Sequence, residues 1–137
     1  MRRFIVILIL LGSIVLANDI ELKSVIFNKI IIAVTAKERP LVYIYKKNEA
    51  LEKYPGALEI VSKCRDADVV VLSTLKDLPE ACKEKIFFGT RYKHLRDRRV
   101  IGSFFWQKGR PNILFYKDRL DKKDIKLDKT FDKYIEE

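Results

Sequence analysis

The spacing of hydrophobic positions predicts a helix in the first part of the chain after residue 18. Asn18 and Glu21 form a capping-box pattern, in which the acidic side chain reaches back to the first turn. Pro40 marks the end of this region. The apolar positions recur at the three-to-four spacing of one helix face: Leu22, Val25, Ile26, Ile30 and Ala33.

Short apolar runs further along the chain predict strands separated by brief helices. The run LVYIY at 41–45 is rich in β-formers, and a short helix capped by Asn48 follows it and stops at Pro55-Gly56. The runs VVVLS at 69–73 and IFFGT at 86–90 suit strands buried on both faces, which is typical of a parallel sheet. ALEIV at 57–61 fits either a helix or a strand, and we interpret it as a strand because Pro-Gly precedes it. A short helical turn is expected at 79–85.

The last third of the chain predicts a hairpin followed by a helix. Segments 100–106 and 112–116 flank a turn that contains Gly109, for which we expect a positive φ. Because alternate strand residues face opposite sides, Phe105 cannot point the same way as Phe104 and Trp106. The basic turn is explained either as the soluble end of the hairpin or as a binding tip. The segment 127–137 predicts a terminal helix with an apolar face formed by Leu127, Phe131, Tyr134 and Ile135.

Together these elements predict an α/β fold. We expect a single-domain sandwich at 18–137, with a mixed, mostly parallel sheet, a C-terminal antiparallel hairpin and a terminal helix. The 120 residues from 18 to 137 are enough for one hydrophobic core and too few for two.

The first seventeen residues have the order of a secretory signal. Two arginines precede an apolar run from Phe4, and Val15 and Ala17 provide the small residues of a cleavage site. We therefore expect cleavage after Ala17 and a periplasmic location; an uncleaved membrane anchor is the alternative.

Export changes how the net charge and the two cysteines are interpreted. The whole chain has a formal net charge of +9, and removal of Arg2 and Arg3 leaves +7. In an exported protein this charge favours anionic ligands, lipid head groups or an acidic protein surface over nucleic acid. Cys64 and Cys82 are the two cysteines, and in an oxidising compartment they predict a disulfide; two buried free thiols are the alternative.

Catalytic and metal-binding patterns do not emerge from the sequence. The single histidine, His94, lies among basic residues, and we expect it to be solvent-exposed and poorly suited to act as a general acid. It has no metal-ligand partner at zinc spacing, and Ser73 lacks a nucleophile-elbow motif. We expect no enzyme activity, metal or cofactor; a hydrolase that uses Ser73 and His94 is a third hypothesis.

Two groups of residues are candidates for binding. Small hydroxyl residues end two buried strands, and ligands bind beyond the carboxyl ends of strands in open α/β sheets. An anion site there would use Ser73, Thr74, Thr90, Arg91 and Lys93. The alternative is that Ser and Thr only punctuate strand ends. The second group, a candidate contact surface for an acidic partner or membrane, consists of Tyr92, Arg96 and Trp106; the alternative is a solvated loop.

The stretches CRDADVVVLS and GSFFWQKGRPNILFY, followed by a terminal helix, are similar to the YfiR-like periplasmic proteins. Cys64 corresponds to a cysteine before the central strand of that family, and Gly102 and Arg110 correspond to positions of its hairpin. The resemblance implies an α/β sandwich that restrains a membrane-bound diguanylate cyclase through its periplasmic domain, with redox-sensitive cysteines. This chain differs from the family in being shorter, in having IGS where paired glycines are usual, and in its heavier aromatic run at 104–106.

The predicted function is therefore that of a periplasmic, non-enzymatic regulatory or binding protein. The alternative is a small module that binds anionic solutes, shaped like one lobe of an extracytoplasmic binding protein.

Overall fold

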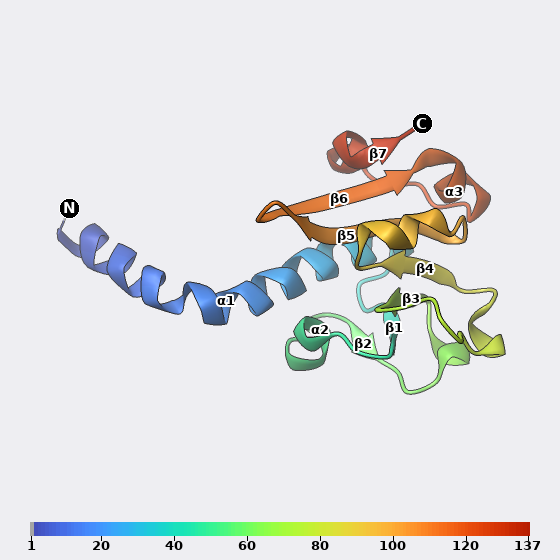
Figure 1. Ribbon diagram of the computed structural model, residues 1–137, viewed down its shortest axis with the longest axis horizontal. Coiled ribbons are helices and arrows are strands. Elements are labelled where there is room, and N and C mark those ends of the chain that lie inside the picture. Colours follow the sequence, from blue (N-terminus) through green and yellow to red (C-terminus); the bar gives the residue numbers. More distant parts are fainter. Residues whose placement is uncertain (1) are drawn as a thin grey trace.

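A seven-stranded sheet organises the chain, with the strand order β2-β1-β3-β4-β5-β6-β7 (Figure 1). The computed structural model describes the backbone of residues 2–137 and the side chains of residues 19–137. The strands are β1 (Leu41–Tyr45), β2 (Glu59–Ile60), β3 (Val69–Leu72), β4 (Ile86–Gly89), β5 (Val100–Gln107), β6 (Arg110–Tyr116) and β7 (Ile135–Glu136). The helices are α1 (Arg2–Thr35), α2 (Glu49–Lys53) and α3 (Lys117–Lys122), with short 3₁₀ helices η1 (Cys64–Asp66), η2 (Glu80–Cys82), η3 (Tyr92–Arg96) and η4 (Lys129–Tyr134).

The pairing of the strands confirms the predicted α/β class. Strands β2, β1, β3, β4 and β5 are parallel to their neighbours, β5 and β6 are antiparallel, and β7 adds a short parallel pair to β6. All four residues of β3 are buried, which explains why its sequence shows no alternation. The segment 57–61 forms a strand over two residues only, Glu59–Ile60, because its exposed edge position offers little burial.

Two apolar layers cover the sheet. On one side, Phe27, Ile30, Ile31 and Val34 of α1 pack against side chains that include Val71, Phe88 and Phe115. On the other side, residues of η1, η2 and η3 pack against alternate strand positions, including Val70, Leu72 and Phe87. In Figure 1, α1 passes behind the strands and the golden turn of η3 lies in front of them.

The core-facing side of α1 differs from the predicted one. Leu22 and Val25 are 49% and 45% exposed, whereas Phe27 and Ile31 are buried. The predicted stripe was therefore wrong at Leu22 and Val25, because the buried face of the helix is rotated and follows Ser24, Phe27, Ile31 and Val34. The cleavage site after Ala17 and the Asn18 cap lie outside the residues whose side chains are described. Within the part of the chain that the structure describes, no helix combines the length and the apolar character needed to cross a bilayer.

The hairpin separates its aromatic residues as predicted. Phe104 belongs to the core layer under α1, and Trp106 contacts it with a centroid distance of 6.0 Å. Phe105 belongs to the opposite layer and lies 5.4 Å from the ring of Tyr92. Gly109 has a φ of 73°, which confirms the expected left-handed turn residue.

The C-terminal segment is not the predicted α-helix. It forms η4, capped by Asp128 through the backbone N–H of Thr130, and then the two-residue strand β7. The apolar spacing from Phe131 to Tyr134 fits a 3₁₀ turn as well as an α-helix, and pairing of Ile135 with Phe115 stops the helix. Helix α3 was not predicted, because its six residues include a single apolar core residue, Leu120.

Candidate functional site

The C-terminal ends of β1, β3, β4 and β5 lie at the same edge of the sheet, and the candidate residues gather there. This follows from the parallel pairing of these strands. Ser73 and Thr74 follow β3, Thr90 and Arg91 follow β4, and Trp106 lies near the end of β5. We call this edge the strand-end surface.

The strand-end hydroxyls are already engaged in hydrogen bonds within the protein. Ser73 Oγ donates to the carbonyl of Tyr45 at 2.9 Å, and Thr90 Oγ1 donates to the carbonyl of Leu72 at 2.7 Å. Ser103 Oγ continues the series by donating to the carbonyl of Arg91 at 3.0 Å. Each hydroxyl therefore ties the end of one strand to its neighbour. Thr74 Oγ1 accepts from the N–H of Lys76, a local turn contact.

His94 is buried, which corrects the expectation that it is exposed. Its side chain is 2% exposed, and its Nδ1 accepts hydrogen bonds from the backbone N–H groups of Thr90 and Arg91 at 3.0 and 3.2 Å. These two amides therefore hold the imidazole and are not free to bind an anion. Gly89 makes room for it, because a Cβ at that position would lie 2.8 Å from the Cβ of His94.

The neutral form of His94 is favoured by its surroundings. Burial lowers the pKa of the imidazole, the positive charges of Arg91 and Lys93 lower it further, and the Ser73 carbonyl opposes them. Nδ1 accepts two N–H groups, so the ring proton is on Nε2. Nε2 is buried, and no described residue meets hydrogen-bond geometry with it, so the Ser73 carbonyl raises the pKa only weakly. The neutral His94 side chain thus fixes the backbone where β4 leads into η3.

Most ion pairs lie at the end of the sheet where strands β1, β3, β4 and β5 begin. The segments leading into β1, β3, β4 and β5, and the segment after β6, carry the ion pairs Lys37–Asp68, Arg39–Glu59, Arg65–Asp66, Lys83–Glu80, Arg99–Asp97 and Lys117–Asp121. Arg99 donates to both carboxylate oxygens of Asp97 at 2.7 and 3.0 Å, and this bonding lowers the pKa of that carboxyl.

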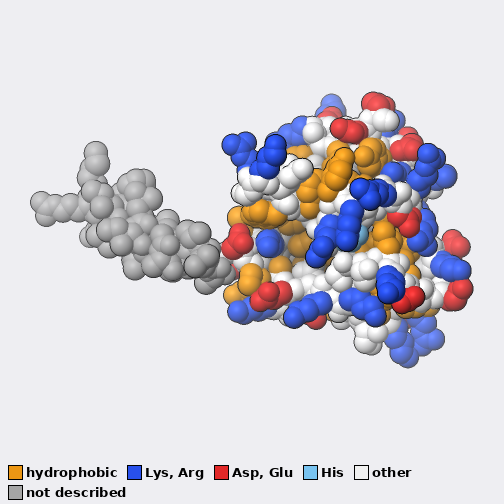
Figure 2. Space-filling view, viewed as in Figure 1, with side chains coloured by type: hydrophobic (Ala, Val, Ile, Leu, Met, Phe, Trp, Pro, Cys, Tyr) orange, Lys and Arg blue, Asp and Glu red, His pale blue; other side chains and the backbone are white. Residues whose placement is uncertain are grey.

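The strand-end surface carries a group of cations that form no ion pairs. Seven exposed cations there form no ion pair with any described side chain: Lys46, Lys47, Lys76, Arg91, Lys93, Lys108 and Arg110. The same edge carries fewer carboxylates, namely Glu49, Glu52, Asp77 and an Asp19 that pairs with Lys23. Figure 2 shows Lys and Arg side chains bordering and crossing an apolar band on the visible face. The opposite end of the sheet also carries exposed cations without an ion pair, among them Lys63, Arg98 and Lys122. What distinguishes the strand-end surface is that its unpaired cations surround exposed aromatic rings.

Exposed aromatic residues lie among these cations. Tyr92 is 58% exposed and rests against Phe105, and Trp106 is 38% exposed with the Lys23 ammonium 5.1 Å from its ring centroid. Arg96 is exposed at the far end of η3, away from the strand ends. A cavity of about 260 Å³ beside Trp106 is lined by Thr90, Lys23 and Asn48 among others. Of the expected anion-site residues, only Thr90 lines this cavity.

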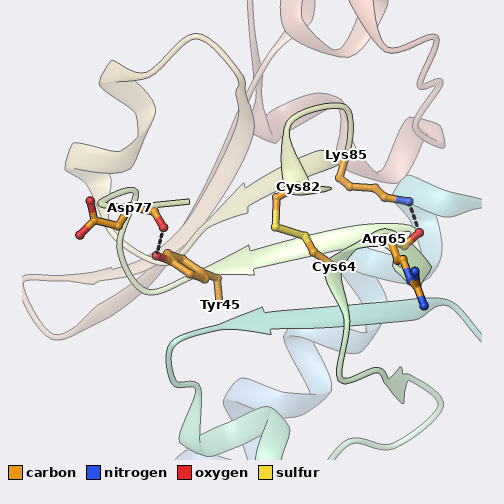
Figure 3. Close-up of a disulfide and its surroundings, with 6 residues drawn as sticks. All are labelled: Tyr45, Cys64, Arg65, Asp77, Cys82 and Lys85. Atoms are coloured by element: carbon orange, nitrogen blue, oxygen red, sulfur yellow. Dashed lines mark hydrogen bonds between the residues drawn. A yellow bond between two sulfur atoms is a disulfide. The ribbon is translucent and has the colours of Figure 1, made fainter. Parts of the chain in front are cut away.

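The predicted disulfide is present. Cys64 of η1 and Cys82 of η2 are bonded, with their Cα atoms 5.3 Å apart and both side chains buried (Figure 3). Lys85 donates to the carbonyl of Arg65 at 2.8 Å beside the bridge, and Tyr45 donates to the carbonyls of Lys76 and Asp77 on the same face. The bridge therefore joins η1 to η2 within the layer that also contains η3.

Two contributions to this region escaped the sequence reasoning. The unpaired lysines after β1, Lys46 and Lys47, carry a weak signal, because a basic pair directly follows an apolar strand. Arg119 of α3 had no signal at all; its guanidinium donates to the carbonyls of Leu95 and Val100 at 2.8 and 2.9 Å and fixes the end of η3.

Within the described residues, no group of His, Cys, Asp and Glu side chains is arranged to hold a metal ion. Comparison with protein-family profiles, curated proteins and solved structures found no match to this chain. The class that the fold defines is a mixed α/β protein with a basic strand-end surface.

Proposed function

We propose that this protein is an exported, non-enzymatic regulatory protein that acts by binding an acidic surface of a partner protein. The observation that carries the proposal is the cluster of seven exposed cations without ion pairs that surrounds the exposed rings of Tyr92 and Trp106 at the strand-end surface. Unpaired cations on one edge create a field that steers an acidic partner toward that edge.

The exposed aromatic residues give the surface anchors for contact. Tyr and Trp are enriched among the residues that dominate binding energy at protein interfaces. Tyr92 and Trp106 lie on opposite faces of β5 at the strand-end surface, so a partner that covers the edge would reach both. Their exposed rings are supported from below by Phe105 and Phe104, so they are held in place before binding.

Export is supported by the order of the first seventeen residues and by the cysteine pair. Disulfides persist in oxidising compartments and are rare in the cytosol. The resemblance to the YfiR-like proteins suggests, as the partner, the periplasmic domain of a membrane-bound signalling protein such as a diguanylate cyclase. Its contact face for this protein would be acidic.

The experiment is capture of the partner from a periplasmic and membrane extract by the tagged protein. Arg91→Glu with Lys93→Glu should reduce capture strongly, and added salt should weaken capture by the unmodified protein. The matched control is Arg65→Glu with Lys83→Glu, which changes net charge equally at the paired edge. Equal capture by the two double variants, with melting temperatures unchanged, would contradict the proposal.

A second candidate function, binding of a small anionic solute, is favoured by the cavity beside Trp106. Lys23 and Thr90 line it and provide a cation and a hydroxyl. Phosphate or acetate should then raise the melting temperature with saturation, and Thr90→Val with Lys23→Ala should abolish the increase. The engaged state of the Thr90 hydroxyl makes this the weaker candidate.

A further inference from the structure

An apolar groove lies on the opposite side of the molecule from η3, between α1, β6 and the C-terminal segment. Its volume is about 860 Å³, within the roughly 300–1,000 Å³ typical of small-molecule sites. Apolar side chains from three elements line it: Ile26, Ile30 and Ala33 of α1, Ile113 of β6, and Phe131 and Tyr134 of η4.

The groove is a consequence of how the C-terminal segment attaches. Strand β7 pairs with β6 only at Phe115 and Tyr116, so η4 stands beside the sheet and does not cover it. Small side chains at Ala33 and Ala36 leave space on the facing side of α1. Phe131 is held edge-on by Phe115 at 6.3 Å and by Tyr134 at 6.2 Å, which gives the groove a firm wall.

The rim of the groove is positively charged. Lys29, Lys126 and Lys133 line it and are exposed, and none of them forms an ion pair with a described side chain. Asp128 is the carboxylate at the rim, and it is occupied as the cap of η4, where it accepts from the N–H of Thr130 at 2.9 Å. An apolar floor therefore meets a cationic edge.

We propose that this groove binds an anionic amphiphile, a molecule with one extended hydrocarbon chain and a single carboxylate. The chain would cover the apolar floor, and the head group would stay at the rim, where the lysines neutralise it while water still reaches it. A ligand with several charges would place some of them against the apolar floor, which is unfavourable.

The dimensions favour such a ligand over a partner helix. From Ile26 to Ala36 the groove follows α1 for ten residues, a length of about 15 Å. A helix of that length with side chains about 10 Å across occupies on the order of 1,200 Å³, so only part of it could lie within the 860 Å³ of the groove and the rest would stay exposed. A single hydrocarbon chain fits within the space.

The test is titration calorimetry of the protein with dodecanoate below its micelle concentration. Saturable binding of one dodecanoate per chain is expected, with weaker binding of dodecanol and of dodecyltrimethylammonium, which lack the negative charge. Ala33→Trp should fill the groove, and Lys126→Glu with Lys133→Glu should reverse the rim; each should weaken binding at least about tenfold. Because the lysines are exposed, the second variant stays informative if the first does not fold.

Lys47→Glu is the control, since it lies at the strand-end surface and should leave dodecanoate binding unchanged. The proposal is overturned if dodecanoate does not bind, if all variants bind equally, or if the cationic amphiphile binds as tightly. It is also overturned if Ala33→Trp converts a self-associated protein to monomers in sedimentation, because a second copy would then occupy the groove. If an acidic amphipathic peptide binds saturably while dodecanoate binds no tighter than acetate, the groove binds a peptide and the proposal is overturned.

Discussion

Reduction of the Cys64–Cys82 bridge should destabilise the protein measurably without unfolding it. The bridge joins residues 18 apart in sequence, and closing a loop of this length in the unfolded chain contributes about 3 kcal/mol in the chain-entropy account. For a domain of this size that loss corresponds to a drop in melting temperature of roughly 10 °C. The native contacts beside the bridge, such as the bond from Lys85 to the Arg65 carbonyl, remain after reduction.

The assay is urea unfolding followed by circular dichroism, with and without a phosphine reductant, and with thiol release checked in denaturant. The variant Cys64→Ala with Cys82→Ala is the control, because its unfolding curve should not respond to the reductant. Oxidised and reduced curves that coincide, when thiol release is complete, would refute the loop-entropy reasoning. Free thiols in the untreated protein would show that the bridge does not form.

Three further changes probe the packing of the sheet. The pKa of His94 is lowered in the folded state, so the unfolded state binds more protons as the pH falls below about 6.5. The stability of the protein should therefore decrease with acidification. The melting temperature of His94→Gln should depend less steeply on pH between about pH 5 and pH 7. Gly102→Ala would place a Cβ 2.5 Å from Phe115 Cδ1, so the free energy of unfolding should fall by about 1–3 kcal/mol in urea titrations; an unchanged midpoint would mean that the ring moves freely. Thr90→Val removes the donor to the Leu72 carbonyl and should cost about 1 kcal/mol by the same measurement, and no loss would show that water replaces the hydroxyl.

The sequence predicted well those strands in which burial alone explains the choice of apolar residues. Val69–Leu72 and Ile86–Gly89 are buried on both faces, and their composition says so directly. The alternation at Phe104, Phe105 and Trp106 was equally predictable, because a strand places successive side chains on opposite faces.

The failures arise where tertiary contacts decide the outcome. His94 has basic neighbours in sequence, but its ring accepts two backbone N–H groups that become available only when β4 turns into η3. Phe131 and Tyr134 have helical spacing, but pairing of Ile135 with the edge of β6 replaces the α-helix. Local patterns carry no information about either partner.

The candidate site was predictable in part. The sequence placed Ser73, Thr90 and Arg91 at one edge, and parallel pairing does bring them to the same edge. It could not show that the hydroxyls are used internally. Nor could it show which cations are paired, since the partner of Lys37 is Asp68, 31 residues away.

The central claim, that the strand-end surface binds a partner, is tested most directly by site-specific photo-crosslinking in the cells that produce the protein. A photoreactive residue in place of Tyr92 should form a covalent adduct with one exported or membrane protein, and high salt in permeabilised cells should reduce the adduct. The same residue in place of Arg65, at the paired edge, should form none. Adducts of equal yield from both positions, or an adduct from position 65 alone, would contradict the claim.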